Sequence, residues 1–428
     1  MLGRSDTVIP SVLARDLAPA FKPRCFAGTL SMTRLAVEGV TAASVYAAVA
    51  RFLLIVVAAC PAYAAEPITP GRIAVAGVDE LINHAIARAE IPGAVLLVGK
   101  GSQIVYEKAY GNCALRPTTR PMTLDTVFDL ASLSKSVGCA PSIMLLAERG
   151  KLTLTDPVAK YIPAFAANGK ETITIAQLLL HQGGLIPDNA MADYQDGPAS
   201  AMAKIYALKP SKEPGKSFVY SDVGYIVLGE LVRVVDGRGL DRFAREEIFQ
   251  PAGMAETLYR PGPELQARCA PTQMREGHWM LGEVHDPRAY ALGGTAGHAG
   301  VFSTARDLSR FCRMILAGGI IDGKRVLAEE TVREMTRPRS LPDGTAWRTY
   351  GFDVDTAYSS CRGERFDPRK TFGHTGFTGT MFWLDPEHDC YFILLTNSVH
   401  PDGRGKTIQL RKAVATDVGE ALLGPSPR

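Results

Sequence analysis

A serine and a lysine stand three residues apart, at Ser132 and Lys135, where the sequence predicts the start of a helix. Side chains at positions i and i+3 of a helix share one face, with about 5–6 Å between their Cβ atoms, so this pair can touch. A serine hydroxyl becomes a good nucleophile when a neighbouring base takes its proton, and a lysine can be that base when burial or a nearby cation disfavours its charged form. The pair could therefore perform nucleophilic catalysis, although a capped, solvated helix start shows the same pattern.

A second group of polar residues lies in the middle of the chain, where Tyr220, Ser221 and Asp222 precede an apolar helical pattern. A phenol at the start of a helix and near a lysine can exchange protons with a reacting group. The same residues also fit a tyrosine packed at a turn, with Ser221 or Asp222 as the helix N-cap. On its own, this segment leaves both interpretations open.

The third group is a glycine-rich segment, residues 373–379, which contains His374, Thr375 and Phe377. Its glycines allow backbone N–H groups to approach a substrate closely. An amide from this segment and the amide of Ser132 could together form an oxyanion hole, in which one donor typically contributes about 3 kcal/mol to transition-state stabilisation. A glycine-rich turn with a capping histidine would show the same residues.

The elements that must position these groups follow a simple order along the chain. Apolar runs predict strands near both ends, and apolar stripes at helical spacing predict helices mainly between them. The expected strands are residues 94–98, 104–110, 350–355, 379–384 and 391–396, and the expected helices include residues 72–90, 175–181, 225–235, 241–249, 304–316 and 406–423.

This order predicts an α+β fold, in which one antiparallel sheet from both chain ends is flanked by helices and a helical domain is inserted between the two parts. We expect the sheet domain to comprise residues 65–131 and 290–428, and the mainly helical domain to comprise residues 132–289. The helix that carries Ser132 then lies at the seam between them, with Pro141 as a kink inside it.

Residues 1–64 are expected to be a leader that does not belong to the fold. A cation precedes an apolar run over residues 52–59, and a small-residue site ends at Ala64, which predicts a secretory signal peptide cleaved after Ala64. The alternative is a lipobox ending at Cys60, which would leave a lipid-anchored N-terminus, but Pro61 argues against it. The apolar run is too short to span a membrane. Since a cleaved signal peptide directs export, we expect a periplasmic or secreted bacterial protein.

The charge balance argues against a nucleic-acid-binding protein. Residues 1–64 hold six of the 47 Lys/Arg and three of the 44 Asp/Glu, so the remaining chain carries 41 of each and has no net charge. The six cysteines after the leader include no C-x-x-C pair and the histidines show no zinc-enzyme spacing, so we expect no metal and no cofactor. Disulfides stay possible in an exported chain, whereas Cys139 and Cys312 lie in helical patterns that predict buried thiols.

The three polar groups occur in the order found in the penicillin-recognising serine enzymes, which carry S-x-x-K, S-D-N and K-T-G motifs. The chain resembles the β-lactamase-related serine hydrolases, the group that contains class C β-lactamases, low-molecular-weight D,D-peptidases, D-aminopeptidases and β-lactamase-fold esterases. Residues 173–185, 214–225 and 297–308 resemble the family's stretches around these motifs, and the resemblance covers roughly residues 72–423.

This resemblance implies a role for each predicted site residue. Ser132 would be the nucleophile and Lys135 its base, while Tyr220 would relay protons to the leaving group. The backbone amides of Ser132 and Phe377 would form the oxyanion hole. The implied site needs no metal and no cofactor.

Two departures from the family pattern limit what the resemblance implies about the substrate. Asp222 stands where many relatives have Asn and adds a negative charge beside Lys135 or the substrate. His374, which with Thr375 would line the third side of the site, stands where β-lactamases have Lys. Because a histidine is largely neutral at pH 7, it would hold a substrate carboxylate less firmly than a lysine. A variant in which Ser221 serves as the serine of an S-D-N motif also stays open.

The expected function is an exported serine hydrolase that forms an acyl-enzyme on a small amide or ester, as in a D,D-peptidase of cell-wall peptides or a β-lactamase-related hydrolase. The alternatives are a penicillin-binding or sensor protein of the same fold with little turnover, and a β-lactamase-fold carboxylesterase. The expected partner is a small-molecule or peptidoglycan-peptide substrate. We expect no nucleic acid and no stable membrane span, with a lipid anchor at Cys60 only in the lipobox alternative.

Overall fold

The computed structural model describes residues 73, 75 and 77–424, with the exception of residues 343, 345, 404 and 406. The expected signal peptide, its cleavage site and Cys60 lie outside these residues. None of the helices in the described part of the chain combines the length and the apolar character that a bilayer crossing requires.

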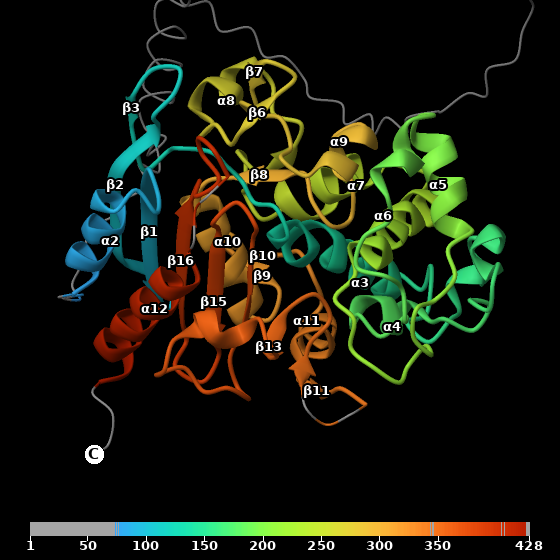
Figure 1. Ribbon diagram of the computed structural model, residues 1–428. Helices are drawn as coiled ribbons and strands as arrows, with labels where there is room; N and C mark the ends of the chain where they lie inside the picture. The colour runs from blue at the N-terminus through green and yellow to red at the C-terminus, as the bar shows by residue number, and fades with distance from the viewer. Residues whose placement is uncertain are drawn as a thin grey trace, which may run out of the picture. The chain divides into compact units, whose positions relative to one another are not determined.

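One nine-stranded sheet forms the centre of the fold, and its strands come from both ends of the chain (Figure 1). The strand order is β11-β12-β13-β14-β15-β16-β1-β2-β3, and every pairing is antiparallel. This arrangement confirms the α+β class and the sheet built from both chain ends. The strands are β1 (Gly93–Lys100), β2 (Gln103–Ala114), β3 (Arg120–Pro121), β11 (Arg339–Ser340), β12 (Trp347–Arg348), β13 (Asp353–Asp355), β14 (Phe372–Thr375), β15 (Met381–Asp385) and β16 (Cys390–Thr396).

The central strands contribute to two hydrophobic cores, because successive side chains of a strand point to opposite faces of the sheet. In β1, Val95 and Leu97 belong to the larger core, whereas Leu96 and Val98 belong to the smaller one. The register between β1 and β16 places Val95 opposite Leu395, so that apolar side chains of the two chain ends meet on the same face.

Helices cover both faces of this sheet. α2 (Val78–Ala87) and α12 (Ile408–Leu423) pack in the smaller core, and α10 (Ala305–Leu316) contacts β1 and β16 on the opposite face. The helices drawn in green in Figure 1 form a second group beside the sheet. The other helices are α3 (Ala140–Glu148), α4 (Ile175–Leu179), α5 (Pro198–Tyr206), α6 (Asp222–Asp236), α7 (Leu240–Ala244), α8 (Pro263–Arg268), α9 (Pro287–Ala291) and α11 (Glu329–Thr336), with π-helical turns at Lys135–Cys139 and Arg245–Phe249 and 3-10 turns at Val158–Lys160, Pro163–Ala166, Met191–Tyr194 and Ser359–Arg362.

A small three-stranded sheet fixes the segment that leads to Ser132. In this sheet β8 (Val301–Ser303) lies between β4 (Phe128–Asp129) and β5 (Leu258–Tyr259), and both pairings are antiparallel. The nucleophile segment is therefore held by parts of the chain that lie far from it in sequence. Two separate hairpins consist of β6 (Met274–Arg275) with β7 (His278–Trp279), and β9 (Ile320–Ile321) with β10 (Lys324–Arg325).

Several element bounds differ from the expectations, and two of the differences have a clear physical cause. The expected strand over residues 350–355 is confined to β13, because Gly351 has a φ of 96° and an added Cβ there would lie 2.5 Å from the Cβ of Ala140. The expected kink at Pro141 takes the form of the π-helical turn Lys135–Cys139, which directly precedes α3.

The six cysteines of the described chain are buried free thiols. The possible disulfides are therefore not formed, and the expectation of buried thiols at Cys139 and Cys312 is confirmed. Burial raises the pKa of the Cys312 thiol well above its ordinary value, so this group packs as a small apolar side chain.

The larger core predicts that two Leu→Ala substitutions will differ in their effect on the free energy of unfolding. Leu395 has no exposed surface and packs in this core, whereas Leu281 is 36% exposed. We expect Leu395→Ala to lower the free energy of unfolding by about 2–5 kcal/mol, because it removes buried methyl groups and leaves a cavity. The matched control Leu281→Ala should change it by less than about 0.5 kcal/mol. Urea unfolding followed by circular dichroism measures both, and equal effects would contradict this description of the core.

Candidate active site

Ser132 lies in a tight turn between β4 and the helical segment that follows. The preceding residue, Ala131, has a φ of 48°, a left-handed conformation that is unfavourable for a non-glycine residue and needs local support. The Asp129 carboxylate accepts hydrogen bonds from the backbone N–H groups of Ala131 at 2.8 Å and His285 at 2.7 Å. Burial raises the pKa of Asp129 to about 6. Asp129, which the sequence analysis did not single out, thus holds the turn that presents the Ser132 hydroxyl.

The glycine-rich segment after β14 is tied to this turn by two threonine hydroxyls. Thr378 Oγ1 donates to the Asp129 carbonyl at 2.7 Å, and Thr380 Oγ1 donates to the Leu130 carbonyl at 3.0 Å. Gly376 lies so close that an added Cβ would be 2.5 Å from the Leu130 oxygen. The first and third predicted groups are therefore neighbours.

Lys135 is fully buried behind Ser132. Its Nζ donates to Ser132 Oγ at 3.1 Å and to the His298 carbonyl at 3.2 Å, and it lies 2.6 Å from Asp222 Oδ1. The contact expected from the i, i+3 spacing is thus present. Burial favours the neutral amine, but Asp222 and Tyr220 outweigh it and raise the pKa of Lys135 above its ordinary value. The resting site therefore holds an ammonium ion, because Asp222 offsets the effect of burial.

Tyr220 lies beside the same ammonium group, just before α6. Lys135 Nζ is 4.9 Å from the Tyr220 ring centroid, and the phenol is within hydrogen-bonding reach of both Lys135 and Ser132. Burial raises the pKa of Tyr220, so that its hydroxyl is protonated at neutral pH and can donate. The structure thus brings Ser132, Lys135 and Tyr220 together.

His181 supports Tyr220 from behind, and the sequence analysis did not identify it as a site residue. The two rings stack with centroids 4.4 Å apart, and His181 Nδ1 accepts a hydrogen bond from the Ser221 backbone N–H at 3.0 Å. The Ser221 hydroxyl itself accepts from the Gly224 N–H and donates to the Ile186 carbonyl. Ser221 is therefore the N-cap of α6, which is the structural role that the sequence left open.

His374 lies on β14, one wall of the site. Its Nδ1–H donates to the Thr375 carbonyl at 2.8 Å, and Nε2 has no hydrogen-bond partner among the described residues. Burial and the positive charges of Arg348 and Lys135 hold the pKa of His374 well below its ordinary value. His374 is therefore a neutral imidazole, as expected for a histidine at this position.

A cavity of about 280 Å³ opens directly onto Ser132 and is also lined by Tyr220, His374, Thr375 and Phe377. Phe377 is 72% exposed and stands at its mouth. The cavity therefore joins five of the seven residues that the sequence predicted. A larger cavity of about 600 Å³ beside α5 and α6 contains none of the seven.

The two backbone amides expected in the oxyanion hole are those of Ser132 and Phe377. Within the described residues, neither amide donates a hydrogen bond to another protein group. Both residues line the same cavity. Two such donors could bind the oxygen of a tetrahedral intermediate, since they are not engaged in the fold.

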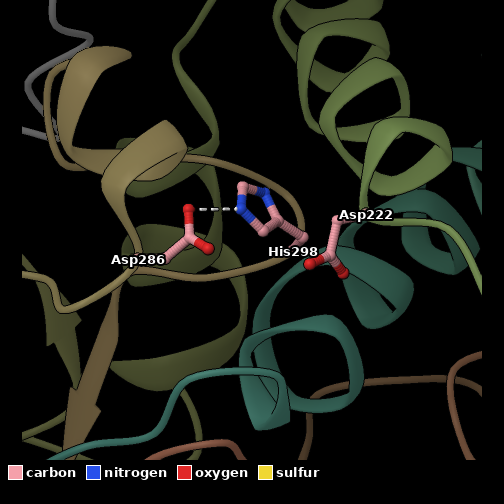
Figure 2. A group of neighbouring side chains, drawn as sticks. All are labelled: Asp222, Asp286 and His298. Carbon is pink, nitrogen blue, oxygen red and sulfur yellow. Dashed lines mark hydrogen bonds and ion pairs between the residues drawn. The ribbon is translucent and has the colours of Figure 1, made fainter. Parts of the chain in front are cut away.

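Asp222, Asp286 and His298 form a polar cluster behind Lys135, and Figure 2 shows how they lie. His298 Nε2 is 2.8 Å from Asp286 Oδ1, and the imidazole is turned toward Asp286. The ligand atoms of the three residues lie within 4.8 Å of one another, which is compatible with a metal ion. The Lys135 ammonium, however, already lies 2.6 Å from Asp222, so a divalent cation would have to bind against a neighbouring positive charge. We therefore assign the cluster to the positioning of Lys135 rather than to a metal.

Comparison with known proteins agrees with this geometry. A family model described as Beta-lactamase matches residues 78–416. A protein of Escherichia coli O157:H7 named "Putative D-alanyl-D-alanine carboxypeptidase" is 33% identical over 352 aligned residues, which cover 73% of this chain and 80% of that protein.

Two solved structures share the fold. A penicillin-binding protein homologue from Caulobacter crescentus gives a TM-score of 0.65 at 22% identity and covers 83% of this chain and 99% of its own. A class C β-lactamase gives a TM-score of 0.66 at 18% identity and covers 82% of this chain and 96% of its own. The fold and the family match define a hydrolase of the β-lactamase fold. The chain belongs to the β-lactamase family, which confirms the resemblance drawn from the sequence.

The ion pair between Lys135 and Asp222 predicts a pH effect. In Asp222→Asn the carboxylate charge is lost, so burial should lower the pKa of Lys135, typically by about one unit or more. If neutral Lys135 is the base, the acid limb of the pH profile of kcat/KM should move to lower pH by a similar amount. Hydrolysis of a p-nitrophenyl ester between pH 5 and 10 measures this shift.

The matched control is Asp188→Asn, which removes a neighbouring carboxylate that pairs with Arg288 at 3.4 Å. The pH profile of kcat/KM of Asp188→Asn should stay close to that of the unmodified chain. An unmoved acid limb in Asp222→Asn, or the same shift in both variants, would rule out the assigned role of the ion pair.

Proposed function

We propose that the chain is an exported serine hydrolase that forms an acyl-enzyme on Ser132 and removes the last residue of a cell-wall peptide ending in D-Ala-D-Ala. The observation that carries this proposal is the 3.1 Å contact between Lys135 Nζ and Ser132 Oγ, with Tyr220 within reach of both. The name of the Escherichia coli relative supports the substrate class. Without that name, the site would support any small amide or ester.

In the acylation step, Ser132 Oγ attacks the carbonyl carbon while its proton passes to the neutral form of Lys135. The carbonyl oxygen becomes anionic and accepts hydrogen bonds from the amides of Ser132 and Phe377. As the C–N bond breaks, Tyr220 donates its proton to the leaving amine and recovers a proton from Lys135. The products of this step are D-alanine and an acyl ester on Ser132.

In the second step, water attacks the acyl ester and gives its proton to the same Lys135–Tyr220 pair. The ester bond breaks, and Ser132 regains its proton as the shortened peptide leaves. Since the ion pair with Asp222 makes neutral Lys135 scarce at neutral pH, we expect activity to rise toward alkaline pH.

A second candidate is a penicillin-binding or sensor protein with little turnover, and one observation favours it. Asp222 stabilises the protonated form of Lys135, which cannot accept the serine proton. A third candidate, a carboxylesterase, is compatible with the neutral His374, because a simple ester carries no carboxylate to be held.

Mass spectrometry of the intact protein tests the acyl-enzyme. Incubation with benzylpenicillin or a p-nitrophenyl ester should add the acyl mass to the unmodified chain and leave Ser132→Ala unlabelled. Labelling that persists in Ser132→Ala would exclude Ser132 as the nucleophile. Release of D-alanine from N-acylated D-Ala-D-Ala, above the Ser132→Ala background, would establish the carboxypeptidase activity. Labelling without release would favour the sensor, and turnover of esters alone would favour the esterase.

Export is the part of the proposal that depends on residues 1–64. Expression of the full chain in a bacterial host should yield an exported form that begins at Ala65, as mass and N-terminal sequencing can show. Cys60→Ala separates the alternatives: it should leave this product unchanged after ordinary cleavage, whereas it should abolish processing if Cys60 is the lipidated residue. A full-length cytoplasmic product would contradict both.

A further inference from the structure

His181 follows the C-cap of α4 at a position where glycine is the usual residue. Its φ is 58°, in the left-handed region. Its N–H donates to the Leu178 carbonyl at 3.1 Å, and the N–H of Gln182 donates to the Gln177 carbonyl at 2.7 Å, which are the two hydrogen bonds of a Schellman motif. Glycine adopts this φ without steric cost, whereas a residue with a Cβ does so at a cost. An unfavourable conformation of this kind points to a task for the side chain.

The segment that carries Tyr220 has no regular secondary structure, because residues 218–221 lie between a turn and the start of α6. Two of its backbone N–H groups are bonded to His181. The Val219 N–H donates to the His181 carbonyl at 3.0 Å, and the Ser221 N–H donates to His181 Nδ1 at 3.0 Å. These two groups flank Tyr220, so a single residue holds the backbone on both sides of it.

The imidazole of His181 also supports the phenol ring of Tyr220. The two rings stack with centroids 4.4 Å apart and an angle of 28° between their planes. Tyr225 of α6 contacts the same imidazole, with centroids 4.9 Å apart, and its hydroxyl donates to the Leu179 carbonyl at 3.0 Å. The ring that supports Tyr220 is therefore itself fixed between α4 and α6.

The property that distinguishes His181 from another aromatic residue is the acceptor at Nδ1. Burial and the positive charges of Arg348 and Lys135 hold the pKa of His181 well below its ordinary value, so the ring is neutral. Since Nδ1 accepts a hydrogen bond, the proton is on Nε2, which is buried and has no partner among the described residues. A buried donor without a partner is unfavourable, and a phenylalanine would stack without this cost.

The position of the Tyr220 hydroxyl decides whether its proton can reach the leaving group. This hydroxyl is within hydrogen-bonding reach of both Lys135 and Ser132. A general acid must lie within about 2.6–3.2 Å of the atom that it protonates. Because the hydroxyl is at the far end of the side chain, a small rotation of the backbone moves it out of this range.

We propose that His181 is the positioning residue of Tyr220, and that its carbonyl, Nδ1 and ring together hold the phenol where it can protonate the leaving group. This inference rests on the acyl-enzyme chemistry proposed above. As the C–O bond of an ethyl ester breaks, Tyr220 gives its proton to the ethoxide oxygen, which leaves as ethanol, and takes a proton from Lys135. The phenoxide of a p-nitrophenyl ester leaves as a stable anion and needs no proton. His181 should therefore matter for the first ester and little for the second.

The test compares ethyl butyrate with p-nitrophenyl butyrate, which share the acyl group and differ in the leaving group. His181→Phe keeps an aromatic ring and removes the acceptor at Nδ1. This variant should lower kcat/KM for the ethyl ester by about 10- to 100-fold and for the p-nitrophenyl ester by less than about threefold. Release of D-alanine from N-acylated D-Ala-D-Ala should fall as the ethyl ester does, because the leaving amine also needs a proton.

His181→Asn is the conservative variant. Asn Oδ1 is separated from the Cα by the same number of bonds as Nδ1 of histidine and also accepts hydrogen bonds. Asparagine is also among the residues that best tolerate a left-handed φ. His181→Asn should therefore recover most of the kcat/KM for the ethyl ester that His181→Phe loses.

The matched control is His400→Phe. His400 is 4% exposed, accepts the Leu115 N–H at 3.0 Å and is not one of the residues that line the cavity at Ser132. Its loss should leave the ratio of the two kcat/KM values unchanged. This ratio does not depend on the fraction of folded enzyme, so a destabilised variant still gives a result. Tyr220→Phe should show the selective loss by itself, and adding His181→Phe to it should not enlarge that loss.

The outcomes separate this inference from the proposed function. Equal losses on the two esters in His181→Phe, or no recovery in His181→Asn, would overturn the positioning role of His181. Release of D-alanine that His181→Phe leaves unchanged would also overturn it, and the carboxypeptidase would stand. A selective loss on the ethyl ester that His181→Asn recovers, without release of D-alanine by the unmodified chain, would support His181 and reject the carboxypeptidase.

Discussion

The buried charge of Lys135 is the constraint on which the site depends. An ammonium ion with no exposed surface is stable only when its environment supplies negative charge and hydrogen-bond acceptors. These come from Ser132 in the adjacent turn and from two segments distant in sequence, with Asp222 at the start of α6 and the His298 carbonyl in a late loop. The hydrogen bonds and the ion pair of Lys135 therefore join the parts of the chain that form the site.

The nine-stranded sheet has a different role: it places the glycine-rich segment beside the turn that carries Ser132. Pairing of β1 with β16 joins the two chain ends, and the hydroxyls of Thr378 and Thr380 then reach the carbonyls of Asp129 and Leu130. These bonds satisfy buried backbone acceptors that would otherwise be costly. The unfavourable φ of Ala131 is tolerated because these hydrogen bonds hold the turn in a single conformation.

Local rules predicted much of this arrangement from sequence alone. The i, i+3 contact of Ser132 with Lys135 and the apolar runs that predict the central strands depend only on neighbours in the chain, and the structure contains both. The sequence did not show whether Asp222 contacts Lys135 or the substrate, because a carboxylate at the start of a helix can face either one. Arg348 and His181 gave no local signal, since their roles arise from packing between strands and helices far apart in sequence.

The two departures from the family pattern are physically connected through the charge of the site. Asp222 neutralises Lys135, so the lysine contributes less positive field to a bound anion than an unpaired ammonium would. His374 contributes no charge at all. The site would then be poor at holding anions unless a further cation lay nearby, and Arg348 lies in the same cavity. Asp353 on neighbouring β13 anchors Arg348, and Ser136 Oγ donates to the carbonyl of Gly351, between these strands, at 2.6 Å, so this wall is tied directly to the helical segment that carries Lys135.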